Sequence, residues 1–105
     1  MKNLNDIMKQ AQALQSRMEA LQAELEALEV EGSAGGGLVR VVMTGKGALK
    51  RVSIDPSLLR EDEREILEDL IVAAASDGKS KAERSAAEKM KGIAGGLPLP
   101  PGFGL

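Results

Sequence analysis

The residues best suited to chemistry are a cluster of basic side chains near the C-terminal end. Five bases stand between positions 79 and 91, against the two acids Glu83 and Glu88. Lysine and arginine bind phosphate groups, and bases near the end of a helix also favour its dipole. Five bases are more than helix capping needs, so the cluster predicts binding to a polyanion. Its members are Lys79, Lys81, Arg84, Lys89 and Lys91.

Groups that catalyse reactions or bind metals are scarce. The chain has no His and no Cys, which removes the commonest general base, the thiolate nucleophile and the usual transition-metal ligands. Residues 61–69 hold six acids, but consecutive acids at a helix start are typical of a solvated face that the dipole favours. The triglycine at residues 35–37 lacks the spacing of a phosphate-binding loop. We therefore expect no catalytic residue, metal, cofactor or small-molecule substrate.

The charges are arranged in blocks along the chain. The net charge is −2, which by itself argues against a partner that is a nucleic acid. Lys2, Lys9 and Arg17 stand near the start, however, and five glutamates follow within residues 18–31. Residues 40–51 are basic again, ahead of the acids at 61–69 and the five bases beyond. Such blocks create local fields that a net count hides.

A long helix over residues 3–28 should position the first of these blocks. Its apolar residues recur at alternating steps of three and four, which is an a/d heptad seam. No Gly or Pro interrupts residues 1–31. A stripe this narrow needs another helix against it, from this chain or from a second copy. The seam consists of Leu4, Ile7, Ala11, Leu14, Met18, Leu21, Leu25 and Leu28.

Three short strands should follow the first helix, over residues 30–34, 38–44 and 48–55. The glycines at 35–37, 45 and 47 supply the turns, so the strands form an antiparallel meander with Val39, Val41 and Met43 on one face. A second long helix is expected from near residue 61, with Asp62 and Glu65 spaced as a capping box. Its predicted buried stripe is Ile66, Leu67, Leu70, Ile71 and Ala74.

The predicted fold class is α+β, with the order α-β-β-β-α in one domain over residues 1–96. Beyond residue 77 the second helix carries mainly small apolar residues, which indicates an exposed arm or a close backbone contact at Gly78. The Pro/Gly-rich tail, residues 97–105, is expected to be extended unless Leu99 and Phe103 dock onto an apolar groove. No apolar run is long enough for a membrane. We expect a cytoplasmic homodimer, because two long helices would otherwise leave apolar stripes in water.

Antiparallel packing of the two helices would join the basic blocks. Lys2, Lys9 and Arg17 would then lie beside the five bases of the second helix, and the acidic stretches would gather near the sheet at the opposite end. A basic tip of this kind suits contact with phosphates of duplex DNA. The single aromatic residue is Phe103, so no platform exists for stacking single-stranded bases.

The sequence also resembles the YbaB/EbfC family of bacterial nucleoid-associated proteins. The matching segments are MKQAQALQSRM (8–18), EGSAGGGLVRVVMTG (31–45), RVSIDPSLL (51–59), EDLIVAAASD (68–77) and LPPGF (99–103). The resemblance implies an α-β-β-β-α protomer, a homodimer with protruding helical arms, and DNA binding in the nucleoid without catalysis. It implies chromosome organisation and a role in gene expression. The positions that fit its DNA contacts are Lys9, Arg17, Lys79, Lys81, Arg84, Lys89 and Lys91.

Two other classes of function remain open from the sequence. A helix, a hairpin region and a second helix also describe a prefoldin-like structural or chaperone module, although these helices are short for that role and their ends are charged. An enzyme is the third class, for which only the acids at 61–69 could be named. Suppression of client aggregation without DNA binding would favour the chaperone, and steady turnover of a substrate would favour the enzyme.

Overall fold

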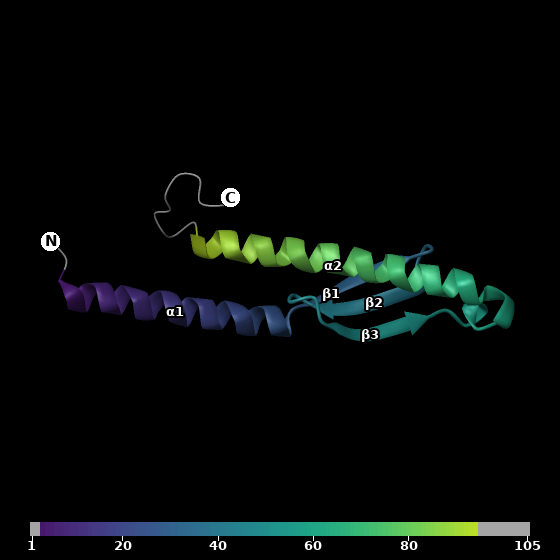
Figure 1. The fold of residues 1–105 in the computed structure, drawn as a ribbon, viewed down its shortest axis with the longest axis horizontal. Coiled ribbons are helices and arrows are strands. Elements are labelled where there is room, and N and C mark those ends of the chain that lie inside the picture. Colours follow the sequence, from purple (N-terminus) through teal and green to yellow (C-terminus); the bar gives the residue numbers. More distant parts are fainter. Residues whose placement is uncertain (1–2, 95–105) are drawn as a thin grey trace.

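A computed structural model describes residues 3–94 and confirms the predicted α-β-β-β-α order (Figure 1). Two short 3-10 turns, η1 and η2, connect the last strand to the second helix. Lys2 and the predicted tail, residues 97–105, lie outside the described residues. The elements are α1 (Leu4–Ala27), β1 (Glu29–Ala34), β2 (Val39–Thr44), β3 (Leu49–Ile54), η1 (Pro56–Leu58), η2 (Glu61–Glu63) and α2 (Arg64–Ala94).

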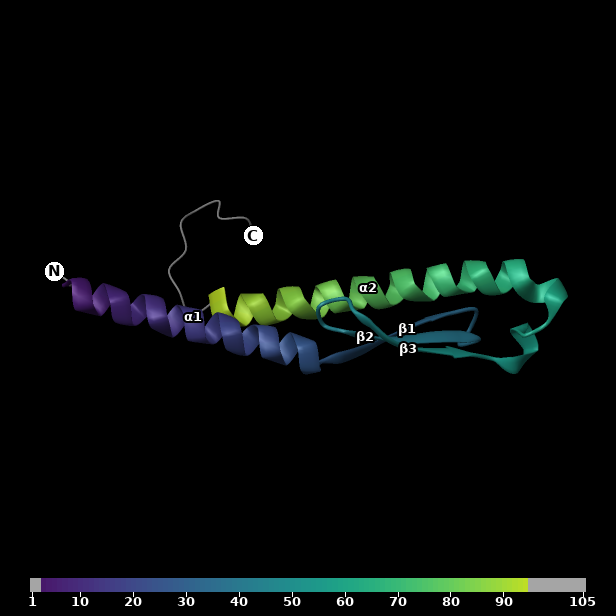
Figure 2. The same cartoon turned by 60° about the horizontal axis from the view of Figure 1, so that its bottom comes forward.

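The long helix α2 spans two regions of different construction. Its first half packs on the sheet, and its second half runs antiparallel to α1 (Figures 1 and 2). We call the strands with residues 64–78 the sheet half, and α1 with residues 79–94 the arm half. The molecule measures 72 × 25 × 15 Å along its principal axes. Its radius of gyration is 19.8 Å, whereas a compact chain of about 100 residues has one near 13 Å.

The sheet has the order β1-β2-β3, and both pairings are antiparallel. The triglycine forms the β1–β2 turn, with positive φ values of 66°, 69° and 97° that glycine adopts at little cost. Side chains of β2 alternate between buried and less buried positions, so Val39, Val41 and Met43 share one face as predicted, and Val41 and Met43 lie against Gly78 of α2. They form the core with Leu58 and Ala74.

Two glycines allow the backbones of β1 and α2 to come into direct contact. A Cβ built on Gly32 would lie 2.3 Å from the backbone nitrogen of Gly78 and 2.4 Å from the carbonyl oxygen of Ala74. A Cβ on Gly78 would in turn lie 3.1 Å from Val41 and 3.2 Å from the sulfur of Met43. The close backbone contact expected at Gly78 is therefore confirmed, and α2 continues through it as one helix.

Helix α1 begins and ends at defined contacts. Asn3 is its N-cap and accepts a 2.9 Å hydrogen bond from the backbone N–H of Asp6. At the other end, the backbone N–H of Gly45 in the β2–β3 turn donates to the carbonyl oxygens of Leu25 and Leu28, at 2.8 and 3.1 Å. Carbonyls at the end of a helix lack partners within it, so these bonds join α1 to the sheet.

The start of α2 differs from the sequence prediction in two ways. Arg60 precedes the η2 turn without a side-chain cap, and Asp62 pairs with Arg60 at 3.3 Å instead of forming a capping box with Glu65. Ile66, in the first turn of α2, is 50% exposed, because the contact of the helix with the core begins one residue later, at Leu67. The rest of the predicted stripe is confirmed, with Ala74 buried and Leu67, Leu70 and Ile71 packed against the core.

The predicted cap of the preceding turn is confirmed. The side chain of Asp55 accepts a 2.9 Å hydrogen bond from the backbone N–H of Ser57, with Pro56 at the first position of the turn. The hydroxyl of Ser57, and after it this backbone N–H, hold the pKa of the Asp55 carboxyl below its usual value. The turn brings Leu58 into the core of the sheet half.

Candidate nucleic-acid interface

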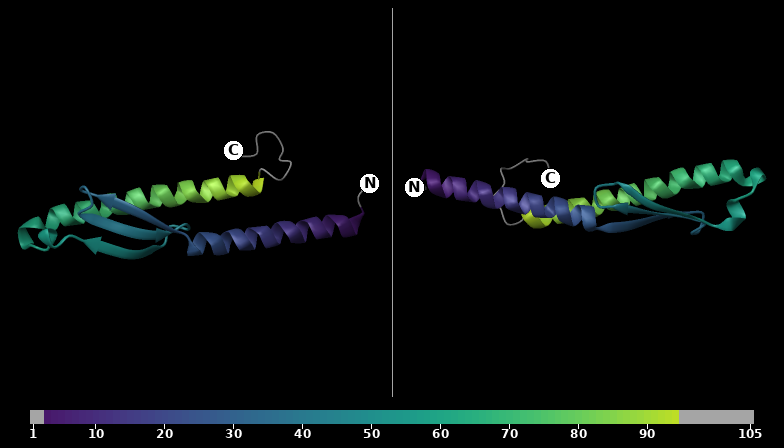
Figure 3. Two further views of the ribbon diagram at one scale, coloured as in Figure 1. Left: turned by 180° about the vertical axis from the view of Figure 1, so that it is seen from behind. Right: turned by 90° about the horizontal axis from the view of Figure 1, so that it is seen from below.

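All seven predicted contact residues lie on the arm half, on two neighbouring antiparallel helices (Figure 3). Lys9 and Arg17 belong to α1, and the other five belong to the second half of α2. Six of the seven are exposed and Lys89 is half-buried, so the set is accessible to a large ligand. They are Lys9, Arg17, Lys79, Lys81, Arg84, Lys89 and Lys91.

Lys89 joins the two helices of the arm half. Its Nζ lies 3.3 Å from Oε2 of Glu24 on α1. Lys89, Glu24 and Arg17 also line one shallow surface hollow, together with Ala20 and Leu21. The fold therefore brings Arg17 and Lys89 together, as the antiparallel prediction required, but it places an acid between them.

Lys81 connects the arm half to the sheet half. Its Nζ lies 3.0 Å from Oδ2 of Asp77 and donates a 3.2 Å hydrogen bond to the carbonyl oxygen of Glu31. Asp77 also accepts a 3.0 Å hydrogen bond from the backbone N–H of Ser33. The Ser33 N–H, and after it Lys81, hold the pKa of the Asp77 carboxyl below its usual value. Lys81 is thus already engaged by groups of its own chain.

The other five bases form no ion pair with any acid in the part of the chain that the structure describes. Lys79 lines a second hollow, where the β2–β3 turn meets α1 and α2, with Lys46 and Glu83. Arg84 lies five residues further along α2 than Lys79. Lys91 lies near the end of that helix. Lys9 and Arg17 are eight positions apart, which is about 12 Å along α1.

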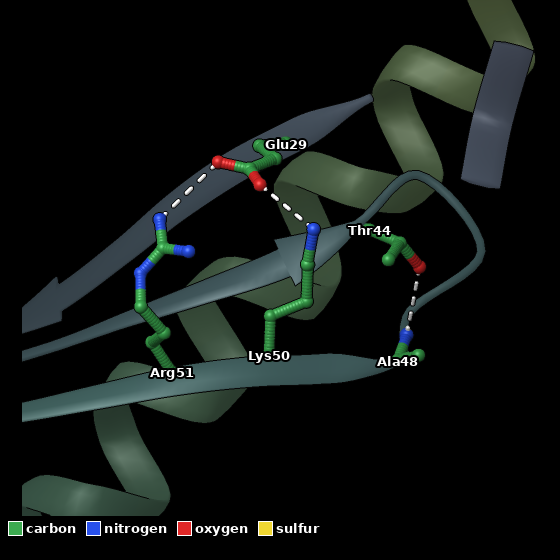
Figure 4. A network of polar contacts seen from close by, with 5 residues as sticks. All are labelled: Glu29, Thr44, Ala48, Lys50 and Arg51. Atoms are coloured by element: carbon green, nitrogen blue, oxygen red, sulfur yellow. Dashed lines mark hydrogen bonds and ion pairs between the residues drawn. The ribbon is translucent and has the colours of Figure 1, made fainter. Parts of the chain in front are cut away.

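Lys46 is a base at this surface that the predicted set omitted. It pairs with Glu26 at 3.0 Å and lines the same hollow as Lys79. The basic block at residues 40–51 was the only sign of this base in the sequence. Nothing in that block shows that Lys46, and not one of its basic neighbours, lies at this surface. Lys50 and Arg51 belong to the same block and are held on the sheet half, 2.8 and 3.2 Å from the carboxylate of Glu29 (Figure 4).

The pairing at Glu29 has an electrostatic consequence. Hydrogen bonds and attraction from Lys50 and Arg51 hold the pKa of the Glu29 carboxyl below its usual value. The carboxylate lies on β1 and both bases lie on β3, so the interaction reaches across β2 (Figure 4). These two bases consequently have an internal partner, unlike Lys79 and Arg84.

The acidic stretches do not gather at one end, contrary to the expectation from antiparallel packing. The end of α1 lies at the middle of the molecule, where Glu24 and Glu26 meet bases from α2 and the β2–β3 turn. The acids at 61–69 lie beyond the other end of the sheet (Figure 1). The physical reason is that the sheet lies between these two segments, since β1 continues in the direction of α1. The arm half is therefore mixed in charge, with bases exposed along it.

Comparisons with known proteins bear on what this surface is for. The sequence model of the YbaB/EbfC DNA-binding family matches residues 1–97. The chain belongs to this family. A nucleoid-associated protein of Nitrobacter hamburgensis is 57% identical over 105 residues, which cover 100% of this chain and 99% of that one. A nucleoid-associated protein of Brucella melitensis biotype 2 is 53% identical, over 100% of this chain and 98% of that one.

A solved structure has the same fold as this YbaB/EbfC family member. It is an uncharacterized protein, HP0035, from Helicobacter pylori, with a TM-score of 0.70. The match covers 91% of this chain and 97% of that chain at 22% sequence identity, so it shows the fold alone. The family is one of nucleoid-associated DNA-binding proteins, which is not an enzyme class.

The structure also bears on metal binding and on membrane insertion. Among residues 3–94, no group of three or more His, Cys, Asp or Glu side chains is arranged to hold a metal ion. None of the described helices combines the length and the apolar character needed to cross a bilayer.

Proposed function

We propose that this protein binds duplex DNA as a homodimer through its arm half, organises the chromosome and modulates gene expression, without catalysis. The observation that carries the proposal is the set of exposed bases on two adjacent helices of a chain whose family binds DNA. Five of these bases have no acid partner among the described residues, so they are available to phosphates. They are Lys9, Arg17, Lys79, Arg84 and Lys91.

The chemistry of the arm half favours backbone contact over reading of bases. Phosphate contacts position a protein on DNA but carry no sequence information directly. The only aromatic residue of the chain is Phe103, and stacking on aromatic rings is what proteins use to hold single strands. We therefore infer a preference for duplex DNA with modest discrimination between sequences.

A second copy of the chain would cover apolar surface that one protomer leaves exposed. Helix α2 packs mainly on β1 and β2. Val52 pairs with Val41 in register and shares its face of the sheet, yet Val52 is 41% exposed and Leu49 is 54% exposed. A symmetric dimer that buries this flank of β3 is the arrangement that we propose. Such a dimer presents two arm halves to DNA.

The decisive experiment is a mobility-shift titration of the full chain on duplex DNA over a series of salt concentrations. The double variant Lys79→Ala, Arg84→Ala should bind all duplex sequences more weakly. Its slope of log affinity against log salt should be about four units shallower, since a dimer of the variant lacks four bases and each lost phosphate contact removes close to one unit. Sedimentation of the same preparations should report the mass of two chains.

A matched control uses two bases at the opposite end of the molecule. Arg60 precedes α2 and Arg64 is its first residue, so both lie beyond the sheet and far from the arm half. The variant Arg60→Ala, Arg64→Ala makes the same change in net charge and should retain more affinity than the arm variant. Equal losses in the two variants would show that net charge, and not the arm half, determines binding.

One observation keeps a prefoldin-like chaperone as the second candidate. Leu4, Ile7 and Leu14 on α1 are 71%, 53% and 40% exposed, and apolar arms are what such proteins present to clients. Light scattering by an aggregating client would test this role. Protection that Ile7→Asp removes, together with absent DNA binding, would replace the first proposal by the second.

A further inference from the structure

The apolar seam of α1 is covered along only part of its length. Leu21 and Leu25 are 3% and 6% exposed, and Met18 is half-buried. Further toward the start, exposure rises to 40% at Leu14, 53% at Ile7 and 71% at Leu4. The spacing of the seam is unchanged through this segment, so the difference comes from what lies opposite it.

The uncovered part begins where α2 ends. Lys89 pairs with Glu24, and α2 continues for five residues to Ala94, a rise of about 7.5 Å. The same distance along antiparallel α1 leads from Glu24 to Glu19. Views from opposite sides show α1 extending well past the end of α2 (Figures 1 and 3). The exposed stripe, which consists of Leu4, Ile7, Ala11 and Leu14, therefore lies beyond the last turn of α2.

We propose that residues 97–103 of the same chain dock along this exposed stripe. Eleven residues follow Ala94, and they leave α2 at the point where the stripe begins. They include Leu97, Leu99 and Phe103, the last being the only aromatic side chain of the protein. The occupant is therefore tethered next to its site, which gives it a high effective concentration there.

The tail and the stripe match in length and spacing. Three prolines within residues 98–101 favour a polyproline II conformation, which repeats every three residues and rises about 3.1 Å per residue. Leu97, Pro100 and Phe103 would then fall on one side of the segment and span about 19 Å. The stripe from Leu4 to Leu14 spans about 15 Å of helix. Leu97 would lie near Leu14, and Phe103 near the start of α1.

The composition of the tail suits an apolar surface. Residues 97–105 contain no charged side chain. A proline-rich segment also loses little conformational freedom when it binds. The docked tail would give the stripe an internal cover and leave the basic side chains of the arm half to a ligand.

A tryptophan reporter tests the docking in the full-length protein. The chain has no Trp, so Phe103→Trp introduces a single one. We expect blue-shifted emission and acrylamide quenching several-fold weaker than in the same protein carrying Ile7→Asp and Leu14→Asp. The control variant adds Val72→Asp, at a position that is 68% exposed on α2 in the sheet half, and should keep the protection. Identical quenching in all three proteins would overturn the proposal.

A disulfide distinguishes the same chain from a second copy. The chain has no Cys, so Leu14→Cys with Leu97→Cys introduces the only two thiols. Mild oxidation should remove both thiols from reaction with a maleimide and leave the mass of one chain on a non-reducing gel. Val72→Cys with Leu97→Cys is the matched control and should stay reduced. A doubled mass for the first variant would overturn the proposal and assign the stripe to a second copy.

Discussion

The sheet half and the arm half of this protein are held together by different interactions. In the sheet half, Val39, Val41 and Ala74 are 0–1% exposed, and two backbones meet at Gly32 and Gly78. In the arm half, the residues buried to a similar degree are Leu21, Leu25 and Ala82. These two helices are also joined by an ion pair between the half-buried Lys89 and the exposed Glu24.

This difference explains where the candidate DNA contacts can lie. Burying a charge is costly, so a dense core leaves little room for bases. The arm half has a thin apolar interface, and most of its surface is free to carry charge. We infer that the sheet half supplies the folding free energy and that the arm half supplies the ligand-binding surface. The following predictions test that division, from the largest expected effect to the smallest.

Replacement of Gly32 by Ala should be the most damaging change. A Cβ at this position would lie 2.3 Å from the backbone of Gly78, and a backbone cannot move aside as a flexible side chain can. We expect a loss of about 3 kcal/mol or more in the free energy of unfolding, measured by urea titration with circular dichroism. Gly92→Ala is the control in the arm half, where nothing lies within 4 Å. It should be neutral or slightly stabilising.

Equal burial should have unequal consequences in the two halves. Val41→Ala removes atoms from the core of the sheet half and should cost about 2 kcal/mol in global unfolding. Leu21 is also buried, at 3% exposed, but we expect that α1 separates from α2 without unfolding of the sheet, so Leu21→Ala removes a contact of the arm half alone. It should cost about 1 kcal/mol or less. Amide exchange should accordingly be faster in α1 than in β2, and equal rates would show that the two halves unfold as one unit.

Release of Lys89 from its acid should strengthen DNA binding. In Glu24→Gln the ion pair is lost and one negative charge is removed from the arm half. We expect an affinity about two- to three-fold higher at low salt, since an exposed pair is worth little and the freed base gains a phosphate. Asp62→Asn is the matched control, because Asp62 pairs with Arg60 beyond the sheet. A change of the same size in both variants would contradict a local effect.

Acid should loosen the junction between the two halves through Asp77. Its pKa is lowered below the ordinary value of 3.8 by the hydrogen bond from Ser33 and by Lys81. A carboxyl with a depressed pKa in the folded state stabilises that state above its unfolded pKa, and the contribution is lost as the pH falls through the folded pKa. Asp77→Asn should therefore show a smaller fall in melting temperature between about pH 5 and pH 3. Glu83→Gln on the same helix should behave like the wild type.

Most of the fold could be predicted because its signals are local. The heptad seam of α1, the alternation in β2 and the triglycine turn each report the conformation of a few neighbouring residues. The Asp62–Glu65 capping box failed because a capping spacing does not reveal that Arg60 offers Asp62 a closer partner. The stripe of α2 was wrong only at Ile66, since periodicity gives the buried face of a helix but not the residue at which contact begins.

The candidate site was predicted less completely than the fold. The exposed bases were identifiable from the high frequency of Lys and Arg in a short stretch of sequence, and the family resemblance placed them on the helices. Lys46 was omitted because its nearness to Lys79 depends on the β2–β3 turn reaching the junction of α1 and α2. Two of these contacts, Lys81 with Glu31 and Lys89 with Glu24, join residues that are far apart in the chain. The third partner, Asp77, is close to Lys81 in the chain but is held in place by the distant Ser33. Their partners could not be chosen from a block of charges.

The sequence by itself determined the order of elements, the family and the residues that carry charge, because each depends on neighbouring residue types. Only the tertiary structure decided which bases are paired, where the acids lie and which part of the α1 seam is exposed. These depend on the lengths of α1 and α2 and on the backbone contact of Gly32 with Gly78. That contact fixes α2 along the sheet, and the end of α2 then determines how much of α1 it can cover.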